Sequence, residues 1–386
     1  MKLVVHYAEI GLKGRNRPRF EERLRQSLRR SLAPLGRVTV EQRYGRVLVG
    51  VPDDAAFEDV RRRIGGCFGV AYFGRVTSCK PEIEAIQRAL EPLLSSRRFA
   101  SFGVRPRRAD KRHPFTSSDL GRQIGRFVAE QTGARVDLTH PEVWIEIHVL
   151  TEEALILHER IAGPGGMPVG TAGLAASLIS GGIDSPVASY ELMRRGATLD
   201  FIHFHSAPFT SEASVEKVRE LVARLARHQG RSTLFVVPFG QLQTELVKHA
   251  PAEPRIVLYR RFMLRVAEAL AIRQGARALV TGDSLGQVSS QTLANLDTIN
   301  RVAKLPVLRP LIGMDKQDIV ARATQIGTFE VSIEPDDDCC SYLMPARPAT
   351  STRPDRLERI EAGLDVARWT QETVERAQQE TIEPEP

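Results

Sequence analysis

The chain has 386 residues, 42% of them hydrophobic and 26% charged, and a net charge of +7, which is the composition of a globular protein of two or three domains. It contains no run of about 18 apolar residues that could cross a membrane, and its first residues do not form a signal peptide. Four cysteines are too few for a disulfide framework, so we expect a cytoplasmic protein without membrane association.

Positive charge is concentrated in the first part of the chain. Residues 1–112 contain 25 Lys and Arg against 12 Asp and Glu, whereas the remaining residues contain 29 and 35. A basic surface of this kind favours a polyanion such as a nucleic acid, although a well-solvated, arginine-rich surface would give the same counts.

The first part of the chain predicts two small α+β units in succession. Apolar residues at helical spacing alternate with short β-like runs, and arginines occupy the opposite face of the first helix. In the first unit we expect a strand over 2–7, a basic turn over 9–17, a helix over 18–34, strands over 38–42 and 46–51, and a helix over 57–64. In the second we expect strands over 71–77, 101–105, 134–137 and 143–150, with helices over 81–94 and 117–132.

After a Gly- and Pro-rich linker at 163–168, longer helices alternate with apolar strands. This alternation predicts a doubly wound parallel sheet. The expected strands lie at 175–179, 198–204, 232–238, 278–281 and 306–308, and the expected helices at 186–195, 212–229, 242–249, 255–274 and 316–326. The acidic C-terminal residues 373–386 are expected to fray.

The strongest chemical signal is the hexad Ser180-Gly181-Gly182-Ile183-Asp184-Ser185, between an apolar strand and a helix. Ligands bind at the carboxyl ends of parallel strands, and two glycines let backbone N–H groups converge on an anion beside the helix N-terminus. Ser180 and Ser185 can donate to phosphate oxygens. Asp184 would repel bare phosphate, so we expect it to hold Mg²⁺. A strand–turn–helix connection with a serine cap would explain one Gly and one Ser, but not the whole hexad.

The hexad resembles the PP-loop of the ATP pyrophosphatase superfamily, whose members split ATP to AMP and pyrophosphate while adenylating a substrate. It lacks the Gly-Lys-Ser/Thr of the other common phosphate loop. Further segments narrow the resemblance to the tRNA 4-thiouridine synthases (tRNA sulfurtransferases), a family linked to thiamine biosynthesis. These segments are residues 9–17, 107–114, 281–292, 308–316 and 338–340.

The resemblance implies an α/β protein in which two smaller domains precede the PP-loop domain. The implied domains are a ferredoxin-like domain over 1–57, a THUMP RNA-binding domain over 58–162, a linker over 163–172, a PP-loop ATP pyrophosphatase domain with a doubly wound parallel sheet over 173–372, and an acidic tail over 373–386. The implied reaction adenylates the C4 oxygen of uridine 8 in tRNA, and a persulfide sulfur then displaces AMP. A homodimer is also implied.

Position by position, the resemblance implies ATP contacts at Leu178, Ile179, Ser180, Gly181, Gly182, Asp184, Ser185, His203, Phe204, Arg260, Gly282 and Gln291. Asp184 and Lys316 are implied in catalysis. His203 could instead be structural, and Arg260 could simply pair with a carboxylate.

Six basic residues are our candidates for contacts with tRNA phosphates, which position an RNA without reading its sequence. They are Lys13, Arg15, Arg107, Arg108, Lys111 and Arg112. A solvated basic loop is the alternative interpretation of the last four.

Cys339 and Cys340 are expected to supply the thiols of sulfur transfer. One would carry the persulfide, and a second thiol would release the product. Three acidic neighbours disfavour a thiolate, and either cysteine could be the carrier. Eleven residues separate Cys67 from Cys79 and no Cys-x-x-Cys occurs, so we expect no iron–sulfur cluster.

The end of the chain bears on the sulfur donor. Fewer than 50 residues follow Cys340 and none is a cysteine, so we expect the form without a C-terminal rhodanese-like domain and direct delivery by a cysteine desulfurase. A sulfur carrier of the ThiS type is a further expected partner. Two alternatives stay open, namely another PP-loop tRNA enzyme, which forms 2-thiouridine or lysidine, and a THUMP tRNA-binding protein without activity.

Overall fold

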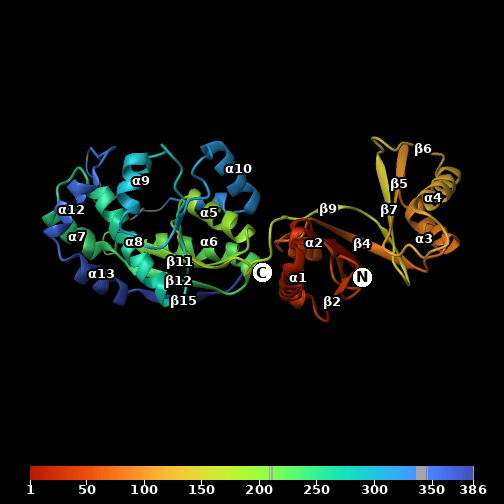
Figure 1. Ribbon diagram of the computed structural model, residues 1–386, viewed down its shortest axis with the longest axis horizontal. Helices are drawn as coiled ribbons and strands as arrows, with labels where there is room; N and C mark the ends of the chain where they lie inside the picture. Colours follow the sequence, from red (N-terminus) through yellow and green to blue (C-terminus); the bar gives the residue numbers. More distant parts are fainter. Residues whose placement is uncertain (208, 210–211, 336–344, 346, 386) are drawn as a thin grey trace. The chain divides into compact units, whose positions relative to one another are not determined.

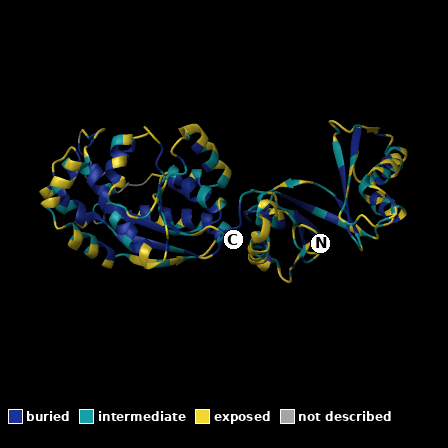
Figure 2. Cartoon of the chain, viewed as in Figure 1, coloured by how far each residue is buried: buried dark blue, intermediate teal, exposed yellow. Residues whose placement is uncertain are grey.

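The computed structural model describes residues 1–207, 209, 212–335, 345 and 347–385, which form two compact units, Met1–Gly166 and Met167–Pro386 (Figure 1). Buried residues follow the strands and the inner sides of the helices in both units (Figure 2). Among the described residues, no helix combines the length and apolarity needed to span a bilayer.

The first unit contains the strands and helices that the sequence predicts, together with two short strands that it does not. The strands are β1 (Lys2–His6), β2 (Thr39–Arg43), β3 (Arg46–Gly50), β4 (Tyr72–Cys79), β5 (Ser101–Arg108), β6 (Arg135–Val136), β7 (Val143–Val149), β8 (Ala154–Leu157) and β9 (Ile161–Ala162); the α-helices are α1 (Arg17–Leu32), α2 (Phe57–Gly65), α3 (Ile83–Ser95) and α4 (Ser117–Thr132). The unpredicted strands are β8 and β9.

One continuous sheet joins the two halves of this unit, in the order β2-β3-β1-β4-β8-β7-β5-β6, with β9 beside β4. The long strand β4 makes the junction, because Tyr72–Arg75 pairs with β1 and Val76–Cys79 pairs with β8. Each half has its own hydrophobic core. The first core includes Val60 and Phe73, beyond the boundary expected at residue 57, because α2 packs against α1.

The second unit contains the predicted alternation of strands and helices. Its strands are β10 (Gly173–Leu178), β11 (Ala197–His205), β12 (Ser232–Pro238), β13 (Leu279–Val280), β14 (Val307–Leu308) and β15 (Gln378–Ile382); its α-helices are α5 (Asp184–Arg194), α6 (Ala213–Gln229), α7 (Gly240–His249), α8 (Arg255–Arg273), α9 (Leu293–Asn300), α10 (Lys316–Ile326), α11 (Phe329–Ser332), α12 (Pro354–Ala362) and α13 (Val366–Glu375), with a 3₁₀ turn η4 (Ser289–Gln291). The sequence did not predict α9, α11, α12, α13 or β15.

The sheet order is β14-β13-β10-β11-β12-β15, and the first five strands are parallel. Helices α5 and α6 contact each other and the strands, as do α8 and α13, so two groups of helices cover the sheet (Figure 1). The predicted doubly wound parallel sheet is confirmed.

The C-terminal tail forms the end of α13 and strand β15, which corrects the expectation that residues 373–386 fray; residue 386 lies outside the described residues. Strand β15 pairs antiparallel with β12 over five residues. Arg219 also holds Glu380 through two hydrogen bonds of 2.8 and 2.6 Å. Backbone pairing and arginine contacts therefore fix a segment whose acidic composition alone suggests disorder.

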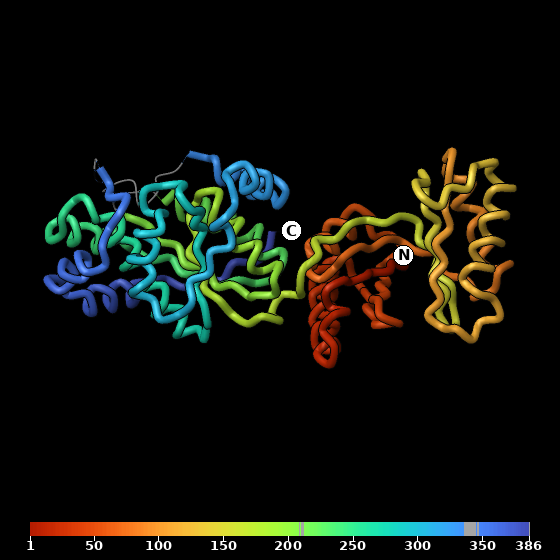
Figure 3. The backbone as a smooth tube through the Cα atoms, turned by 45° about the horizontal axis from the view of Figure 1, so that its top comes forward, coloured from red at the N-terminus to blue at the C-terminus, as the bar shows by residue number. Residues whose placement is uncertain are grey.

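The expected linker at 163–172 is hydrogen-bonded along most of its length. Gly165 accepts a bond from Gly69 N–H at 2.7 Å in the first unit. Met167 donates to the Arg194 carbonyl at 2.9 Å in the second. Figure 3 traces the chain through this segment. The chain therefore passes from the first unit to the second between Gly165 and Met167.

Candidate active site

The expected phosphate loop lies at the end of β10, where the chain turns through residues 179–183 into α5. Ser185 closes the loop: its Oγ accepts a hydrogen bond from the Ser180 N–H at 2.9 Å and lies 3.2 Å from Ser180 Oγ. A hydroxyl contact of 2.8 Å between Ser177 and Ser189 fixes α5 on β10. The loop is thereby held beside the N-terminus of a helix, an arrangement that favours a phosphate.

The Thr-Gly-Asp segment after β13 packs directly on this loop. A Cβ atom at Gly282 would lie 2.7 Å from the backbone nitrogen of Ser185 and 2.8 Å from its Cα. Only glycine permits this approach, because the opposing atoms belong to the backbone and cannot rotate away. Gly282 therefore sets the distance between two walls of the site.

Gly282→Ala is expected to weaken ATP binding by about tenfold or more, because overpacking of about 1–3 kcal/mol must be relieved by displacing the phosphate loop. Calorimetric titration with a non-hydrolysable ATP analogue measures the affinity. Gly313→Ala is the matched control, since a Cβ there meets nothing within 4 Å. Equal affinities for the two variants would contradict a rigid contact between these walls.

A cavity of about 400 Å³ lies between the loop and α8, a size suited to a small ligand. Its apolar lining includes Leu178, Ile179, Phe204, Ile256, Met263, Leu264 and Ile299. Its polar lining includes Ser180, Gly182, Asp184, Ser185, Arg260, Gly282, Asp283, Ser290, Gln291 and Arg309. This division can accommodate an apolar ring on one side and an anionic chain on the other.

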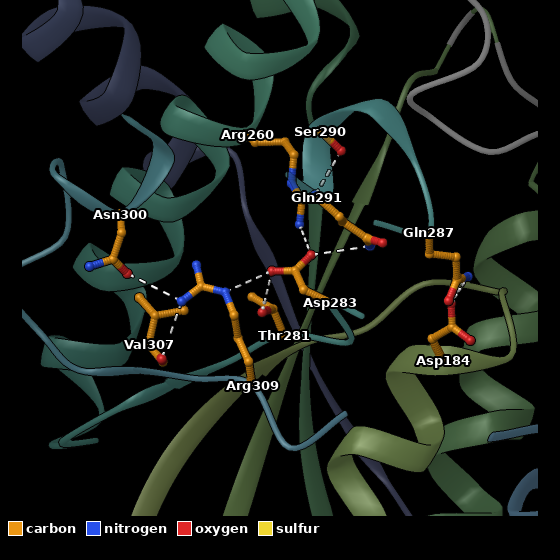
Figure 4. A network of polar contacts seen from close by, with 10 residues as sticks. All are labelled: Asp184, Arg260, Thr281, Asp283, Gln287, Ser290, Gln291, Asn300, Val307 and Arg309. Atoms are coloured by element: carbon orange, nitrogen blue, oxygen red, sulfur yellow. Dashed lines mark hydrogen bonds and ion pairs between the residues drawn. The ribbon is translucent and has the colours of Figure 1, made fainter. Parts of the chain in front are cut away.

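Asp283 is the centre of a buried polar network in this cavity (Figure 4). Its carboxylate pairs with Arg260, accepts a bond from Arg309 Nε at 3.0 Å, and accepts one from Thr281 Oγ1 at 2.7 Å. Burial raises the pKa of Asp283, but Arg260, Thr281 and Arg309 outweigh it and lower that pKa to about 2. One ionised carboxylate therefore holds two arginines at the wall of the site.

Asp184 begins α5 and lines the cavity, and both of its carboxylate oxygens are engaged. Lys316 Nζ lies 2.6 Å from Oδ1. Gln287 Nε2 donates to Oδ2 at 2.7 Å (Figure 4). Lys316 is the first residue of α10. Asp315 caps the N-terminus of this helix, because its side chain accepts hydrogen bonds from two backbone N–H groups. The capped helix thus brings Lys316, 132 residues along the chain, to the phosphate loop.

The cavity brings together most residues expected to contact ATP, but not all of them. His203 is not among its lining residues; it is buried, and its Nδ1 lies 3.1 Å from the Ile179 carbonyl oxygen, so it supports the end of β10. Gly181 is buried within the turn. Arg260 lines the cavity and also pairs with the carboxylate of Asp283, so its position is compatible with both expectations, a phosphate contact and an ion pair. Cys339 and Cys340 lie outside the described residues.

Sequence reasoning missed several residues of this site. Asp283 and Arg309 lie within segments already noted, Thr281–Thr292 and Leu308–Lys316, but nothing in the sequence indicated that they pair with each other. Ile256 and Met263 come from α8, whose apolar residues read as ordinary core. Their role depends on which strand end the helix crosses.

The six candidate tRNA contacts differ in their surroundings. Arg15, Arg107 and Lys111 are exposed, and Lys13 Nζ lies 5.2 Å from the centre of the Phe20 ring. Arg108 donates to the backbone carbonyls of residues 113 and 115, which shapes the basic loop. Arg112 pairs with Asp110 at 2.7 Å, and these hydrogen bonds lower the pKa of that carboxyl well below its usual range.

Two basic segments of the first unit, residues 13–17 and 105–113, meet at the β2–β3 turn. Tyr44 in that turn donates to Thr151 Oγ1 at 2.6 Å, and a Cβ at Gly45 would lie 3.1 Å from Arg17 Nη2. The basic loop is tied to the same place, since His113 Nε2 lies 2.7 Å from the Leu150 carbonyl oxygen. The structure therefore joins segments that are distant in sequence into one basic surface.

Three family models match the chain in succession. The ThiI ferredoxin-like domain matches residues 2–74, the THUMP domain matches 80–159, and the thiamine biosynthesis protein model (ThiI) matches 170–366. The chain belongs to the ThiI family. The three-part architecture that the sequence motifs implied is thereby confirmed for this ThiI-family chain, a PP-loop domain preceded by a ferredoxin-like and a THUMP domain.

Named relatives support this assignment over the full length. A probable tRNA sulfurtransferase from Thermus thermophilus is 46% identical, covering 94% of this chain and 89% of the relative; one from Moorella thermoacetica is 43% identical, covering 99% and 98%. Among solved structures, a 4-thiouridine synthetase in complex with RNA and ATP matches with a TM-score of 0.90 and 35% identity, covering 99% of each chain. The ThiI-family chain is thus similar in sequence and fold to tRNA-thiolating enzymes.

Proposed function

We propose that the chain is an ATP-dependent tRNA sulfurtransferase that converts uridine 8 of tRNA to 4-thiouridine and releases AMP and pyrophosphate. The observation that carries the proposal is the closed loop 180–185 beside a cavity of about 400 Å³, with Lys316 paired to Asp184 in its lining. Relatives named tRNA sulfurtransferases and the matching 4-thiouridine synthetase support the choice of substrate.

ATP fits the cavity with its adenine on the apolar wall and its phosphates at the loop. Mg²⁺ is usually held by one or two carboxylates together with phosphate oxygens and water. No group of three or more His, Cys, Asp and Glu side chains in the described part of the chain is arranged to hold a metal. Asp184 would therefore hold Mg²⁺ jointly with the nucleotide, and the ion would supply positive charge at the phosphates.

Adenylation overcomes the poor leaving ability of the uridine C4 oxygen. That oxygen attacks the α-phosphorus, and pyrophosphate departs with the electron pair of the broken P–O bond. Backbone N–H groups of the loop and the Arg260 guanidinium are placed to stabilise the negative charge that develops on the phosphates. Lys316, 2.6 Å from Asp184, holds that carboxylate in position at the phosphate loop.

Sulfur transfer then uses the two cysteines at 339 and 340. The terminal sulfur of a cysteine persulfide attacks C4, and AMP leaves. A second thiol attacks the resulting Cys–S–S–C4 linkage, so 4-thiouridine is released and the two cysteines become a disulfide that an external thiol must reduce. A cysteine desulfurase would supply the persulfide sulfur, and a ThiS-type carrier would accept sulfur for thiamine synthesis.

The basic surface of the first unit would hold the tRNA through its phosphates, using Lys13, Arg15, Arg107, Lys111 and Arg112. We further propose that the protein works in the cytoplasm as a homodimer. Size-exclusion chromatography with light scattering, with and without tRNA, tests the dimer.

A coupled assay tests the proposed reaction. The protein is incubated with a tRNA transcript, ATP-Mg²⁺, cysteine and a cysteine desulfurase, and the near-ultraviolet absorption of 4-thiouridine is followed together with AMP. Thiolation and AMP release are expected in equal amounts, and Cys339→Ser and Cys340→Ser are expected to identify the persulfide carrier. Full thiolation by both serine variants would exclude the proposed sulfur chemistry, and AMP release without 4-thiouridine would assign another substrate atom.

A further inference from the structure

A cluster of buried polar side chains lies in the first unit, outside the nucleotide cavity. It forms where β1, β3, β4 and β7 meet. His6 pairs in register with Tyr72 on β4, and their rings stack with centres 4.3 Å apart. Arg46 is the first residue of β3 and directly precedes Val47, which pairs with Val5 on β1. The ring of His148 on β7 meets His6 edge-on at 5.0 Å.

Four polar atoms of this cluster are buried without a hydrogen-bond partner in the described structure, namely His6 Nε2, Arg46 Nε, Arg46 Nη1 and Tyr72 Oη. Two further buried atoms, Glu146 Oε2 and His148 Nε2, face each other at 3.8 Å. Arg46 is 8% exposed and His148 only 1%. Buried polar groups almost always have a partner, so this concentration of unpaired groups, mostly donors, indicates a ligand from outside the chain.

The charges of the cluster leave a positive excess. Arg46 makes no ion pair among the described residues, whereas Glu146, the one carboxylate, lies 3.5 Å from Arg160 and 3.8 Å from His148. Arg107 on β5 is paired in register with His148 and is exposed to solvent. A buried guanidinium without a counter-ion is unfavourable, so an anion is the ligand that its surroundings favour.

Both histidines lie in surroundings that keep them neutral. Burial lowers the pKa of His6 to about 3, and the neighbouring His148, Arg46 and Arg107 act in the same direction. Burial likewise lowers the pKa of His148, although Glu146 opposes it. Neutral imidazoles still donate one N–H each, so the two histidines add donors to the cluster, and its positive charge comes from the arginines.

We propose that this cluster is a binding site for a phosphate oxyanion, with Arg46, His6 and Tyr72 as its donors and Arg107 at its exposed side. A guanidinium matches the paired oxygens of a phosphate. The site lies directly after the β2–β3 turn, where Tyr44 contacts Thr151 and the two basic segments meet. Its occupant is then either a backbone phosphate of RNA or a free phosphate. The assignment to RNA rests on the proposed function.

The RNA source is tested with Arg46→Gln in the full-length chain. We expect tRNA affinity to fall about tenfold. The slope of log Kd against log salt should decrease by about one, which corresponds to the loss of one phosphate contact. Arg43→Gln is the matched control from the same hairpin, because Arg43 is already paired with Glu41 at 3.0 Å. Arg46→Lys, which keeps the charge, should recover most of the salt slope.

The free-phosphate source is tested by thermal unfolding in inorganic phosphate and in chloride of equal ionic strength. Wild type and Arg43→Gln should be stabilised by phosphate, and Arg46→Gln should not. A phosphate effect without an RNA effect would assign a free anion, and both effects together would assign an RNA phosphate. If wild type binds tRNA but neither measurement distinguishes Arg46→Gln, the cluster holds only water and the proposal is wrong. If wild type fails to bind tRNA, the proposed function fails, while the phosphate measurement still decides this site.

Discussion

Asp184→Asn is expected to reduce AMP formation by about 10³-fold, because charge stabilisation by a metal ion contributes several kcal/mol and about 4 kcal/mol corresponds to this factor. Asparagine preserves the shape of the side chain and its one oxygen can still accept from Lys316, while the negative charge and the acceptor for Gln287 Nε2 are lost. Single-turnover release of AMP in the presence of tRNA measures the change. Raising the Mg²⁺ concentration should recover part of the rate, since the lost interaction is with the ion.

The control for this variant is Asp318→Asn, which removes an exposed carboxylate in the first turn of α10. It should leave the rate within a factor of two or so, because an exposed charge of this kind contributes about 0–1 kcal/mol. Thermal unfolding of both variants should match wild type. An Asp184→Asn protein with undiminished AMP release would remove Asp184 from the chemistry and with it the proposed Mg²⁺ site.

Asp283→Asn is expected to destabilise the second unit by about 3 kcal/mol, which lowers its melting temperature by about 10 °C. Two arginines, Arg260 and Arg309, would then face each other without the carboxylate that now lies between them. Their repulsion should also displace Arg260 from the cavity wall and weaken ATP binding about tenfold, or about 1.4 kcal/mol. Differential scanning calorimetry and ATP titration measure the two effects.

Asp297→Asn provides the comparison, because it also removes an Asp–Arg pair. Asp297 and Arg301 are 3.1 Å apart on the surface of α9, and both side chains are more than half exposed. Water can replace that contact, so the expected change is below about 1 kcal/mol. The contrast between a buried and an exposed pair separates the effect of burial from that of charge. Similar melting temperatures for both variants would show that Asp283 does not hold the two arginines in place.

Much of the second unit was predictable because its signals are local. The helix expected at 316–326 is α10 with the same bounds, and that expected at 255–274 is α8 to within one residue. Apolar periodicity and terminal residues determine such helices within a single segment. The short helices α9 and α12 were missed because eight or nine residues make too few turns to show a helical period. Their burial also depends on α8, whose Arg261 lies 2.6 Å from Glu361 of α12.

The tail shows why local composition can mislead. Residues 378–382 have no apolar alternation, so nothing within the segment predicts a strand. The strand forms because β12 offers an open edge, and because Arg219 pairs with Glu380 within β15 and Arg231 pairs with Glu383 directly after it. These partners are about 150 residues away in the sequence, a separation at which composition carries no information about pairing.

The sequence by itself determined the family, the order of the domains and the phosphate loop, because each depends on motifs whose residues act within one turn or one strand–helix connection. Only the tertiary structure decided which side chains face each other. It brought Lys316 to Asp184, placed Asp283 between two arginines, and gathered Arg46, His6 and His148 from three strands into one buried cluster. Such contacts arise from strand order and helix crossing, which depend on packing of the whole unit rather than on any one segment.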